Sequence, residues 1–452
     1  MENDIIFNRS RISVDFYVGQ EMDVDPKDEM WMLMTELFPI CRSITGNGFR
    51  NSLHILKSIV PEIQIFEVST GTKVYDWTVP KEWNIREAYI ENENGDRILD
   101  FRDNNLLVVG YSLPLDEWMD AEELKQICYI QEDQPEVIPY VTSYYKERSG
   151  FCMTKKLRDS LKGRYHAVID STLEEGSLTY GEAYFKGECD KEILISTYLC
   201  HPSMANNECS GPVVTVMLAD FIKKMKKRKY SYRFVFIPET IGSLTYLSQN
   251  YEEKRLKENV IAGFVLSCVG DERTYSIVES RKANTLADRV LQNVLQFYYP
   301  AYMKYSYLER GSDERQYNAP GIDLPVCAVC RSKYGEYPEY HTSKDDLSLV
   351  TPEGLMGSYE LMKLCFQALE YNAYYKVTCL GEPQLGKRGL YPTVSQKGSY
   401  DRVKSMTDFL AYADGSMDVI EISNQIRTPV HDLVSIIETL KDHDLIMTQK
   451  EM

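Results

Sequence analysis

The sequence predicts an α/β fold: a layered sheet with helices on both faces, to which two smaller domains are attached. Two observations support the layered sheet. Continuous apolar runs at 193–199 and 232–237 have the length and the β-branched and aromatic content of buried strands. Segments of helical character, such as 286–297 and 352–373, alternate with runs of this kind. This alternation is typical of a sheet covered by helices.

The first segment of the body, residues 1–70, is expected to contribute two helices, at 26–38 and 49–59. A polar turn at 42–48 separates them. Arg42 in this turn is a candidate to hold a substrate carboxylate, although a structural ion pair explains an arginine there equally well.

A change of composition then marks a second domain. Short alternating apolar runs surround an Asn-Gly pair at 94–95, which is a strong hairpin signal. We therefore expect a small β-rich domain inserted at 72–139, with the body continuing over 140–380. Trp77 and Trp83 near the start of the insert are candidates either for a pocket wall or for the core.

A third domain is expected at 387–452, beyond a linker at 387–392. Its expected elements are three short helices and a strand, at 400–413, 419–423, 430–440 and 445–450. Their spacing predicts a winged helix-turn-helix. The candidate recognition helix carries Asp432, Glu438 and Asp442, whereas DNA readers usually concentrate Lys and Arg there. We expect the module to pack against a protein partner or a second copy of the chain rather than DNA.

Composition places the chain among soluble proteins. With 51 Lys and Arg against 68 Asp and Glu, the net charge is −17, which disfavours a nucleic-acid-binding body. No apolar run approaches the roughly 20 residues of a membrane span, and no secretory leader is recognisable. The 11 cysteines favour buried, reduced thiols, and Cys327 and Cys330 are expected to be packing residues. We expect a cytoplasmic protein with no membrane partner.

Polar side chains follow the ends of the expected strands, where ligands bind in open α/β sheets. His201 ends the first apolar run, Glu239 follows the second, and His341 lies beyond a loop rich in Gly, Pro and Tyr. Imidazoles and carboxylates delivered by separate strand ends are the parts of a zinc hydrolase. Taken alone, a histidine at such a strand end is explained equally well as a structural residue that hydrogen-bonds backbone groups in a capped turn.

The order of these motifs resembles the zinc aminopeptidase fold, whose members include bacterial aminopeptidases and glutaminyl cyclases. More closely, the chain resembles a bacterial group of aminopeptidase-like proteins with an inserted domain and a winged-helix tail, associated with surface-polysaccharide clusters. The phrases that carry the likeness are LFPICRSITGNG, DWTVPKEW, CHPSMANNECSG, PETIGS and YHTSKDD, at 37–48, 76–83, 200–211, 238–243 and 340–346. They span nearly the whole chain.

The resemblance implies roles for individual residues. His201 and His341 match the two metal-binding histidines, and Glu239 matches the general base. Asn207 stands where the family has a bridging Asp, so Glu208, one place later, is the alternative loop ligand. We expect one zinc ion per chain, held by His201, Glu208 and His341.

Further positions depart from the pattern of two metals. Thr240 and Ser267 stand where the resemblance implies carboxylate ligands, so a pair of metals is not expected. Asp313 matches a Ser-Asp phrase that lies beside the family pocket, and we expect it in the cleft, orienting a ligand or a histidine. A solvated loop carboxylate is the alternative for Asp313.

Three functions remain open from the sequence. The first is a zinc-dependent aminopeptidase-like hydrolase of a small peptide or amide, with a role in surface-polysaccharide metabolism. The second is a degenerate binding protein that keeps the shape without the chemistry, which the neutral residues at positions 207, 240 and 267 favour. The third is a regulator whose tail reads DNA while the body senses a ligand, which the acidic tail disfavours.

Overall fold

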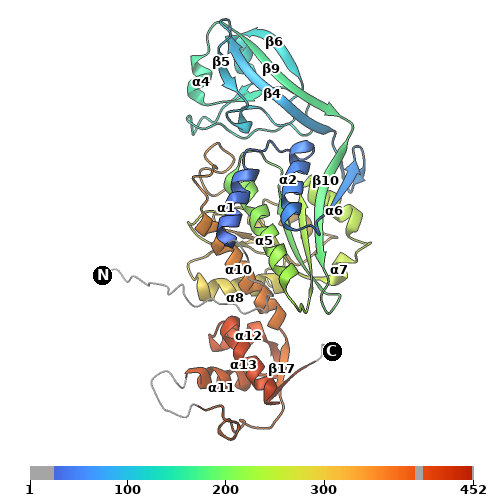
Figure 1. Cartoon of the computed structure of the whole chain (residues 1–452), viewed down its shortest axis with the longest axis vertical. Coiled ribbons are helices and arrows are strands. Elements are labelled where there is room, and N and C mark those ends of the chain that lie inside the picture. The colour runs from blue at the N-terminus through green and yellow to red at the C-terminus, as the bar shows by residue number, and fades with distance from the viewer. Residues whose placement is uncertain (1–24, 392–400, 450–452) are drawn as a thin grey trace, which may run out of the picture.

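The computed structural model of the chain describes residues 25–391 and 401–449. Three parts follow one another along the long axis: a sheet-based domain at one end, the α/β body in the middle and a helical module at the other end (Figure 1). The parts of the predictions that fall on residues 1–24, 392, 400 and 450–452 lie outside the described residues.

The body is built on an eight-stranded mixed sheet. Its strands, in spatial order, are β1 (Gln64–Ser69), β10 (Ser177–Phe185), β12 (Ser231–Ile237), β11 (Glu192–Tyr198), β13 (Val260–Leu266), β16 (Val326–Cys330), β14 (Ser276–Val278) and β15 (Met303–Tyr305). The four central strands, β12, β11, β13 and β16, are parallel to one another. Strands β10 and β14 join them antiparallel at either side.

Alternate side chains of each central strand enter two different cores, which is the physical reason for the layers. On β11, Ile193 and Ile195 belong to one apolar cluster, and Leu194 between them belongs to the other. The first cluster includes helices α1 (Pro26–Leu37), α2 (Asn47–Ile59), α5 (Ser210–Lys224), α8 (Leu286–Tyr298) and α10 (Pro352–Tyr371). The second includes α6 (Ile241–Asn250), α7 (Leu256–Asn259) and α9 (Glu314–Tyr317). Helices thus cover both faces, as the fold class predicts.

The register of the central strands brings the chemical residues together. Strands β11 and β12 pair in parallel over their whole length, with Tyr198 beside Ile237 at their carboxyl ends. The loops that carry His201 and Glu239 therefore leave the sheet at the same edge. This is where an open α/β sheet binds ligands.

The inserted domain is larger than its composition suggests. Its sheet consists, in spatial order, of β5 (Arg97–Asp100), β4 (Glu82–Asn92), β9 (Arg164–Glu174) and β6 (Leu115–Asp120). The other elements of the insert are α3 (Ala121–Gln126), α4 (Lys155–Ser160), η2 (Asn105–Leu107) and the paired short strands β7 (Cys128–Tyr129) and β8 (Phe151–Cys152). β9 was expected in the body over 140–380, but it pairs antiparallel with β4 on one side and β6 on the other. The chain returns to the central sheet only at β10, three residues after β9 ends.

The two tryptophans of the insert have different environments. Trp83 lies on β4, is buried, and its indole N–H donates to the carbonyl oxygen of Ser112 at 2.8 Å. Trp77 lies in a separate hairpin of β2 (Lys73–Val74) and β3 (Trp77–Thr78) and is partly exposed. Trp83 is therefore a core residue, whereas Trp77 faces a cavity described below.

The C-terminal module begins before the expected linker. Its elements are β17 (Tyr374–Val377), η5 (Gly386–Arg388), α11 (Asp401–Tyr412), β18 (Asp414–Asp418), α12 (Val419–Ile426), α13 (Val430–Asp442) and β19 (Ile446–Thr448). β17 was expected in the body, but it is the central strand between β18 and β19. Its four residues were too short a signal to assign to either domain.

The module packs directly on the body. Asn293 on α8 donates to the hydroxyl of Ser423 on α12 at 2.9 Å, and Arg289 pairs with buried Asp418 at 2.8 Å. His431 at the start of α13 hydrogen-bonds Gln367 on α10 at 2.6 Å. The candidate recognition helix is thus held against α10 in this arrangement. None of the helices in the described ranges combines the length and the hydropathy needed to cross a bilayer.

Candidate active site

His201 and Glu239 line a narrow cleft at the carboxyl edge of the sheet. The cleft has a volume of about 220 Å³, and its walls also include Tyr144, Thr240 and Arg315. The loops after β11 and β12 supply His201 and Glu239, and α9 supplies Arg315. The inserted domain closes the cleft from above through Trp77, Tyr144 and Tyr145.

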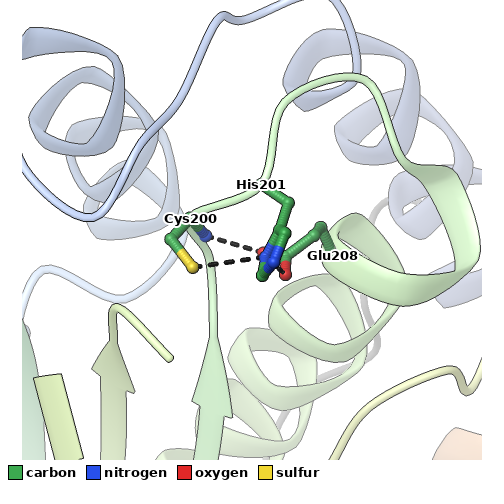
Figure 2. Close-up of side chains that lie close together, drawn as sticks. All are labelled: Cys200, His201 and Glu208. Carbon is green, nitrogen blue, oxygen red and sulfur yellow. Dashed lines mark hydrogen bonds and ion pairs between the residues drawn. The ribbon is translucent and has the colours of Figure 1, made fainter. Parts of the chain in front are cut away.

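His201 is buried between two carboxylates. Its Nδ1 contacts Glu208 Oε1, and its Nε2 lies 3.8 Å from Glu239 Oε2. Figure 2 shows His201 and Glu208 pointing toward each other across the loop that joins the strand end to α5. Burial opposes protonation of His201, but the charges of Glu208 and Glu239 outweigh it and raise the pKa of the ring.

Glu208 reaches His201 because it lies on a π-helical turn, η3 (Ala205–Cys209), that begins α5. Such turns are frequent at functional sites. The second carboxylate oxygen of Glu208 accepts a hydrogen bond from the backbone N–H of Cys200 at 2.6 Å. The Cys200 thiol lies 3.4 Å from His201 Nδ1 and accepts from the backbone N–H of Glu239 at 3.3 Å. Cys200 therefore links the two strand ends.

The turn is held in place by Asp345, a residue to which the sequence reasoning assigned no role. Its buried carboxylate accepts the backbone N–H groups of Asn206 and Asn207 at 2.6 and 3.0 Å and the hydroxyl of Tyr337 at 2.9 Å. Removal from water raises the pKa of Asp345 to about 7 in spite of these donors. Its place in the phrase YHTSKDD, four residues after His341, was the available signal.

His341 enters the site from the opposite side. Its backbone has a positive φ of 56°, a strained conformation for a residue with a side chain. The ring stacks on Tyr340 with a centroid separation of 3.9 Å and lies 5.1 Å from the ring of His201. Its Nε2 is buried and has no hydrogen-bond partner within 25–391 and 401–449. Burial, reinforced by the nearby charge of His201, lowers the pKa of His341 to about 2, so the ring is neutral.

Tyr140 connects the inserted domain to both histidines. Its ring centroid lies 4.6 Å from that of His201 and 5.2 Å from that of His341. Its backbone N–H donates to the carbonyl oxygen of His341 at 3.0 Å, and its hydroxyl bonds that of Tyr144 at 2.5 Å. No sequence signal identified Tyr140, because its role depends on contacts between distant segments.

Glu239 stands at the mouth of the cleft on a tight turn. Removal from water, opposed by the charge of His201 and reinforced by that of Glu208, raises its pKa to about 7. The next residue, Thr240, has a positive φ of 62°. Its backbone N–H donates to Asp313 Oδ1 at 2.8 Å, and the hydroxyl of Ser243 donates to the same oxygen at 2.8 Å.

The expectation that Asp313 orients one of the histidines is not met among the described residues. The carboxylate is fully buried, and the partners described for it belong to the turn that carries Glu239, not to either histidine. Burial, then the charge of Glu239, raises the pKa of Asp313 to about 8. It is a positioning residue for the Glu239 turn, and the alternative of a solvated loop carboxylate is also wrong.

Arg42 does not contact the cleft as a substrate-binding residue would. It is 1% exposed, and its guanidinium donates to the carbonyl oxygens of Leu37 at 2.5 Å and His201 at 3.2 Å. These bonds fasten the His201 loop to the end of α1. The arginine that lines the cleft is Arg315, which donates to the hydroxyl of Thr240 at 2.6 Å and has a buried Nε without a partner.

The donor set fits one zinc ion. The donor atoms of Cys200, His201 and Glu208 lie within 4.8 Å of one another, so the thiol joins the set that the sequence predicts. The separation of 5.1 Å between the two imidazole rings is about the 5 Å expected when both bind one tetrahedral zinc. His341, the third predicted ligand, does not belong to this group of donor atoms. Its buried Nε2 has no hydrogen-bond partner among the described residues, so it is available to complete the set.

The positions that would complete a second metal site are already engaged. The hydroxyl of Thr240 is bound by Arg315, and that of Ser267 is bound by Tyr198. Asn207 donates through its amide to Tyr198 at 3.1 Å, and its Oδ1 is buried without a partner. All three groups are neutral, so they supply none of the negative charge that carboxylate ligands would bring to a second metal ion.

Comparison with known proteins places these features in a family. Residues 31–372 match a family model described as a domain of unknown function (DUF4910), and residues 373–448 match a winged helix-turn-helix model. The chain is 44% identical over 398 residues to a Clostridium acetobutylicum protein named for polysaccharide biosynthesis and an aminopeptidase-like domain, covering 87% of this chain and 90% of that protein.

Solved structures agree. A crystal structure of a candidate peptidase from Clostridium acetobutylicum superposes with a TM-score of 0.88 at 40% identity, covering 94% of this chain and 96% of that one. A zinc aminopeptidase from Bacillus subtilis shares the fold with a TM-score of 0.55 at 13% identity, over 75% and 93% of the two chains. The predicted aminopeptidase-type fold with a winged-helix domain is confirmed, and the chain belongs to the DUF4910 family of aminopeptidase-like proteins.

Proposed function

We propose that the chain is a zinc-dependent hydrolase that cleaves a peptide or amide bond of a small substrate. The observation that carries the proposal is Glu239, a carboxylate with a pKa of about 7 that lies 3.8 Å from His201 in the wall of the cleft. A general base works best when its pKa is near the working pH. The name of the Clostridium relative supports a role in polysaccharide biosynthesis.

Each residue of the site has a distinct task in this proposal. His201, His341 and Glu208 would hold the zinc, with Cys200 beside them. A zinc ion supplies Lewis acidity that makes water a nucleophile near neutral pH. Glu239 accepts the proton of the attacking water and returns it to the nitrogen of the leaving amine.

Two cleft residues support binding rather than proton transfer. Arg315 lines the wall of the cleft, where a guanidinium group suits a carboxylate or the oxygen of the scissile carbonyl. Tyr140 excludes water from the face of both imidazoles. A dry site strengthens each of these electrostatic contacts.

A second candidate is a binding protein without catalysis. The neutral residues Asn207, Thr240 and Ser267 favour it, since each replaces an anionic ligand implied by the resemblance to two-metal enzymes. The contacts of Thr240 and Ser267 with Arg315 and Tyr198 are consistent with a site that no longer needs those charges.

Metal analysis and two variants separate the candidates. We expect about one zinc per chain after growth with zinc, and hydrolysis of an aminoacyl amide. Glu239→Gln should keep the zinc and lower turnover by about two to four orders of magnitude, because one general base is lost. His201→Ala should lose both, since it removes the imidazole that stands between Glu208 and Cys200 in the donor group. Full activity in Glu239→Gln would refute its role, and a chain without zinc or hydrolysis would favour the binding protein.

For the C-terminal module we propose contact with a protein or a second copy of the chain. The solvent-exposed side chains of α13 include Asp432, Glu438 and Asp442, which repel phosphate groups. Excess duplex DNA should give no salt-sensitive complex with the full chain, whereas sedimentation should detect self-association. A specific complex with DNA at low micromolar concentration would contradict this assignment.

A further inference from the structure

A second, larger chamber lies next to the catalytic cleft. Its volume is about 500 Å³, against about 220 Å³ for the cleft itself. The two cavities share three aromatic walls, Trp77, Tyr144 and Tyr145. The outer chamber therefore adjoins, at these rings, the cleft that contains His201 and Glu239. The chamber is within the range of roughly 300–1,000 Å³ that holds drug-sized ligands.

Aromatic rings dominate the boundary between the chambers. Trp77 on β3 is 37% exposed and Tyr145 is 61% exposed, and their rings meet edge to face at 5.6 Å. Tyr111 and Tyr144 form a second edge-to-face pair deeper in the chamber, at 5.1 Å. Large aromatic side chains left exposed together at a cavity mark a binding surface.

Charged groups of both signs surround these rings. Asp76 and Glu147 line the outer chamber together with Lys81 and Lys146, so its lining carries two carboxylates and two ammonium groups. Within the described residues none of the four forms an ion pair, and each is exposed. The formal charges cancel, which gives the chamber no preference for an anion or a cation. The carboxylates are acceptors and the ammonium groups are donors, so the chamber offers a ligand both kinds of hydrogen-bonding group.

This combination selects a ligand class. A sugar ring has an apolar face that packs on an aromatic ring and a rim of hydroxyls that both donate and accept hydrogen bonds. An apolar amino-acid side chain would use the rings but would desolvate the charged groups without pairing them. An anionic ligand would meet two carboxylates as well as two lysines.

We propose that the outer chamber is a saccharide subsite that binds one or two neutral sugar rings of the substrate. The inference rests on the proposed hydrolase function and narrows its substrate to an amide or peptide that carries a sugar. The sugar lies against Trp77 and Tyr145, and the scissile amide reaches past Tyr144 to Glu239. Binding at such a remote subsite is a source of energy for positioning the reacting bond.

The test is saccharide binding to the full chain, measured by isothermal titration and by tryptophan fluorescence. The ligands are maltotriose, cellotriose and the trimer of N-acetylglucosamine, with a galacturonic acid trimer as the charged comparison and Phe-Ala amide as the apolar one. We expect at least one neutral trisaccharide to bind in preference to both comparison ligands. Trp77→Ala should weaken that binding by about tenfold or more, as should Tyr145→Ala.

Trp118→Ala is the matched control. Trp118 is also an exposed tryptophan, at 47%, but it lies on β6 of the inserted sheet, stacked on His166 and outside both chambers. Its replacement should leave saccharide affinity unchanged. The proposal is overturned if no neutral saccharide binds, if Trp77→Ala and Trp118→Ala behave alike, or if the apolar or charged ligand is the one that depends on Trp77.

Because this measurement needs no turnover, it separates the subsite from the proposed function. Saccharide binding without amide hydrolysis would refute the hydrolase and leave the subsite in place. Hydrolysis without saccharide binding would do the reverse. A far-ultraviolet spectrum and a melting temperature for each variant show that it is folded, and Trp77→Phe, which keeps a ring, should retain most of the affinity.

Discussion

Asp313→Asn should make the protein more stable at alkaline pH. The carboxyl group of Asp313 is fully buried, and one of its oxygens has no hydrogen-bond partner. Burial and the neighbouring charge of Glu239 raise its pKa from 3.8 to about 8. At a pH between its unfolded and folded pKa values, such an acid is protonated to a greater extent in the folded protein than in the unfolded chain. Its contribution to the free energy of unfolding is therefore full below about pH 4 and falls as the pH rises toward 8.

The magnitude follows from the shift. Each unit of pKa corresponds to about 1.4 kcal/mol, so a shift of roughly four units sets an upper bound of about 6 kcal/mol at pH 9. Relaxation and water entry reduce such penalties in real proteins, and we expect about 2 kcal/mol. Asparagine keeps an oxygen for the N–H of Thr240 and the hydroxyl of Ser243 and cannot ionise.

The assay is the melting temperature of the wild type and Asp313→Asn between pH 5 and 9. The difference should increase in favour of the variant as the pH rises, by about 2 °C for each kcal/mol. Ser243→Ala is the control, since it removes one donor to Asp313 without changing the charge, and it should not reproduce the pH trend. A variant that loses stability equally at every pH, or most at high pH, would refute the reasoning.

Two other contacts give predictions of their own. Tyr140→Ala should weaken zinc binding by about tenfold or more, because the ring packs on both histidines. Tyr140→Phe should keep the affinity, because the hydroxyl bonds Tyr144 and neither histidine among the described residues. Equal zinc affinity in the alanine variant, measured by competition with a chelator, would contradict this. Arg42→Lys should lower the free energy of unfolding by about 2–3 kcal/mol and the melting temperature accordingly. The reason is that a single ammonium group cannot reach the carbonyl oxygens of both Leu37 and His201. An unchanged melting temperature would show that these bonds do not hold the loop.

The strand ends were predictable because two general rules act on them together. Apolar runs such as 193–199 cannot be exposed, and parallel strands deliver their following residues to one edge of the sheet. His201 and Glu239 follow from these rules without knowledge of any tertiary contact. The register of β11 against β12 then places them across one cleft.

The contacts of single side chains were not predictable in the same way. Arg42 was a candidate to hold a substrate carboxylate, and Asp313 was placed in the cleft because its Ser-Asp phrase matches the family. Both are buried and bind backbone groups of the loops that carry His201 and Glu239. β9 alternates like any strand with one exposed face, so its pattern does not show which sheet it joins. Tyr140 lies about 60 residues before His201 and 200 before His341, and no periodicity connects such distances.

Charge balance decides how many metal ions the site holds. The carboxylates that reach the imidazoles are Glu208 and Glu239, and the groups at positions 207, 240 and 267 are neutral. Burial raises the pKa of the Cys200 thiol well above its usual value, so the thiol counts as neutral. One dication beside two carboxylates then leaves the buried centre neutral, whereas two dications would leave it with two uncompensated charges, which a buried site does not tolerate. Titration with zinc followed by native mass spectrometry should therefore reach one ion per chain and stay there when zinc is in several-fold excess. Asn207→Asp, which adds an anion where a buried amide oxygen has no partner, should strengthen the first ion. A wild-type chain that takes up two ions of similar affinity would show that this balance does not govern the site.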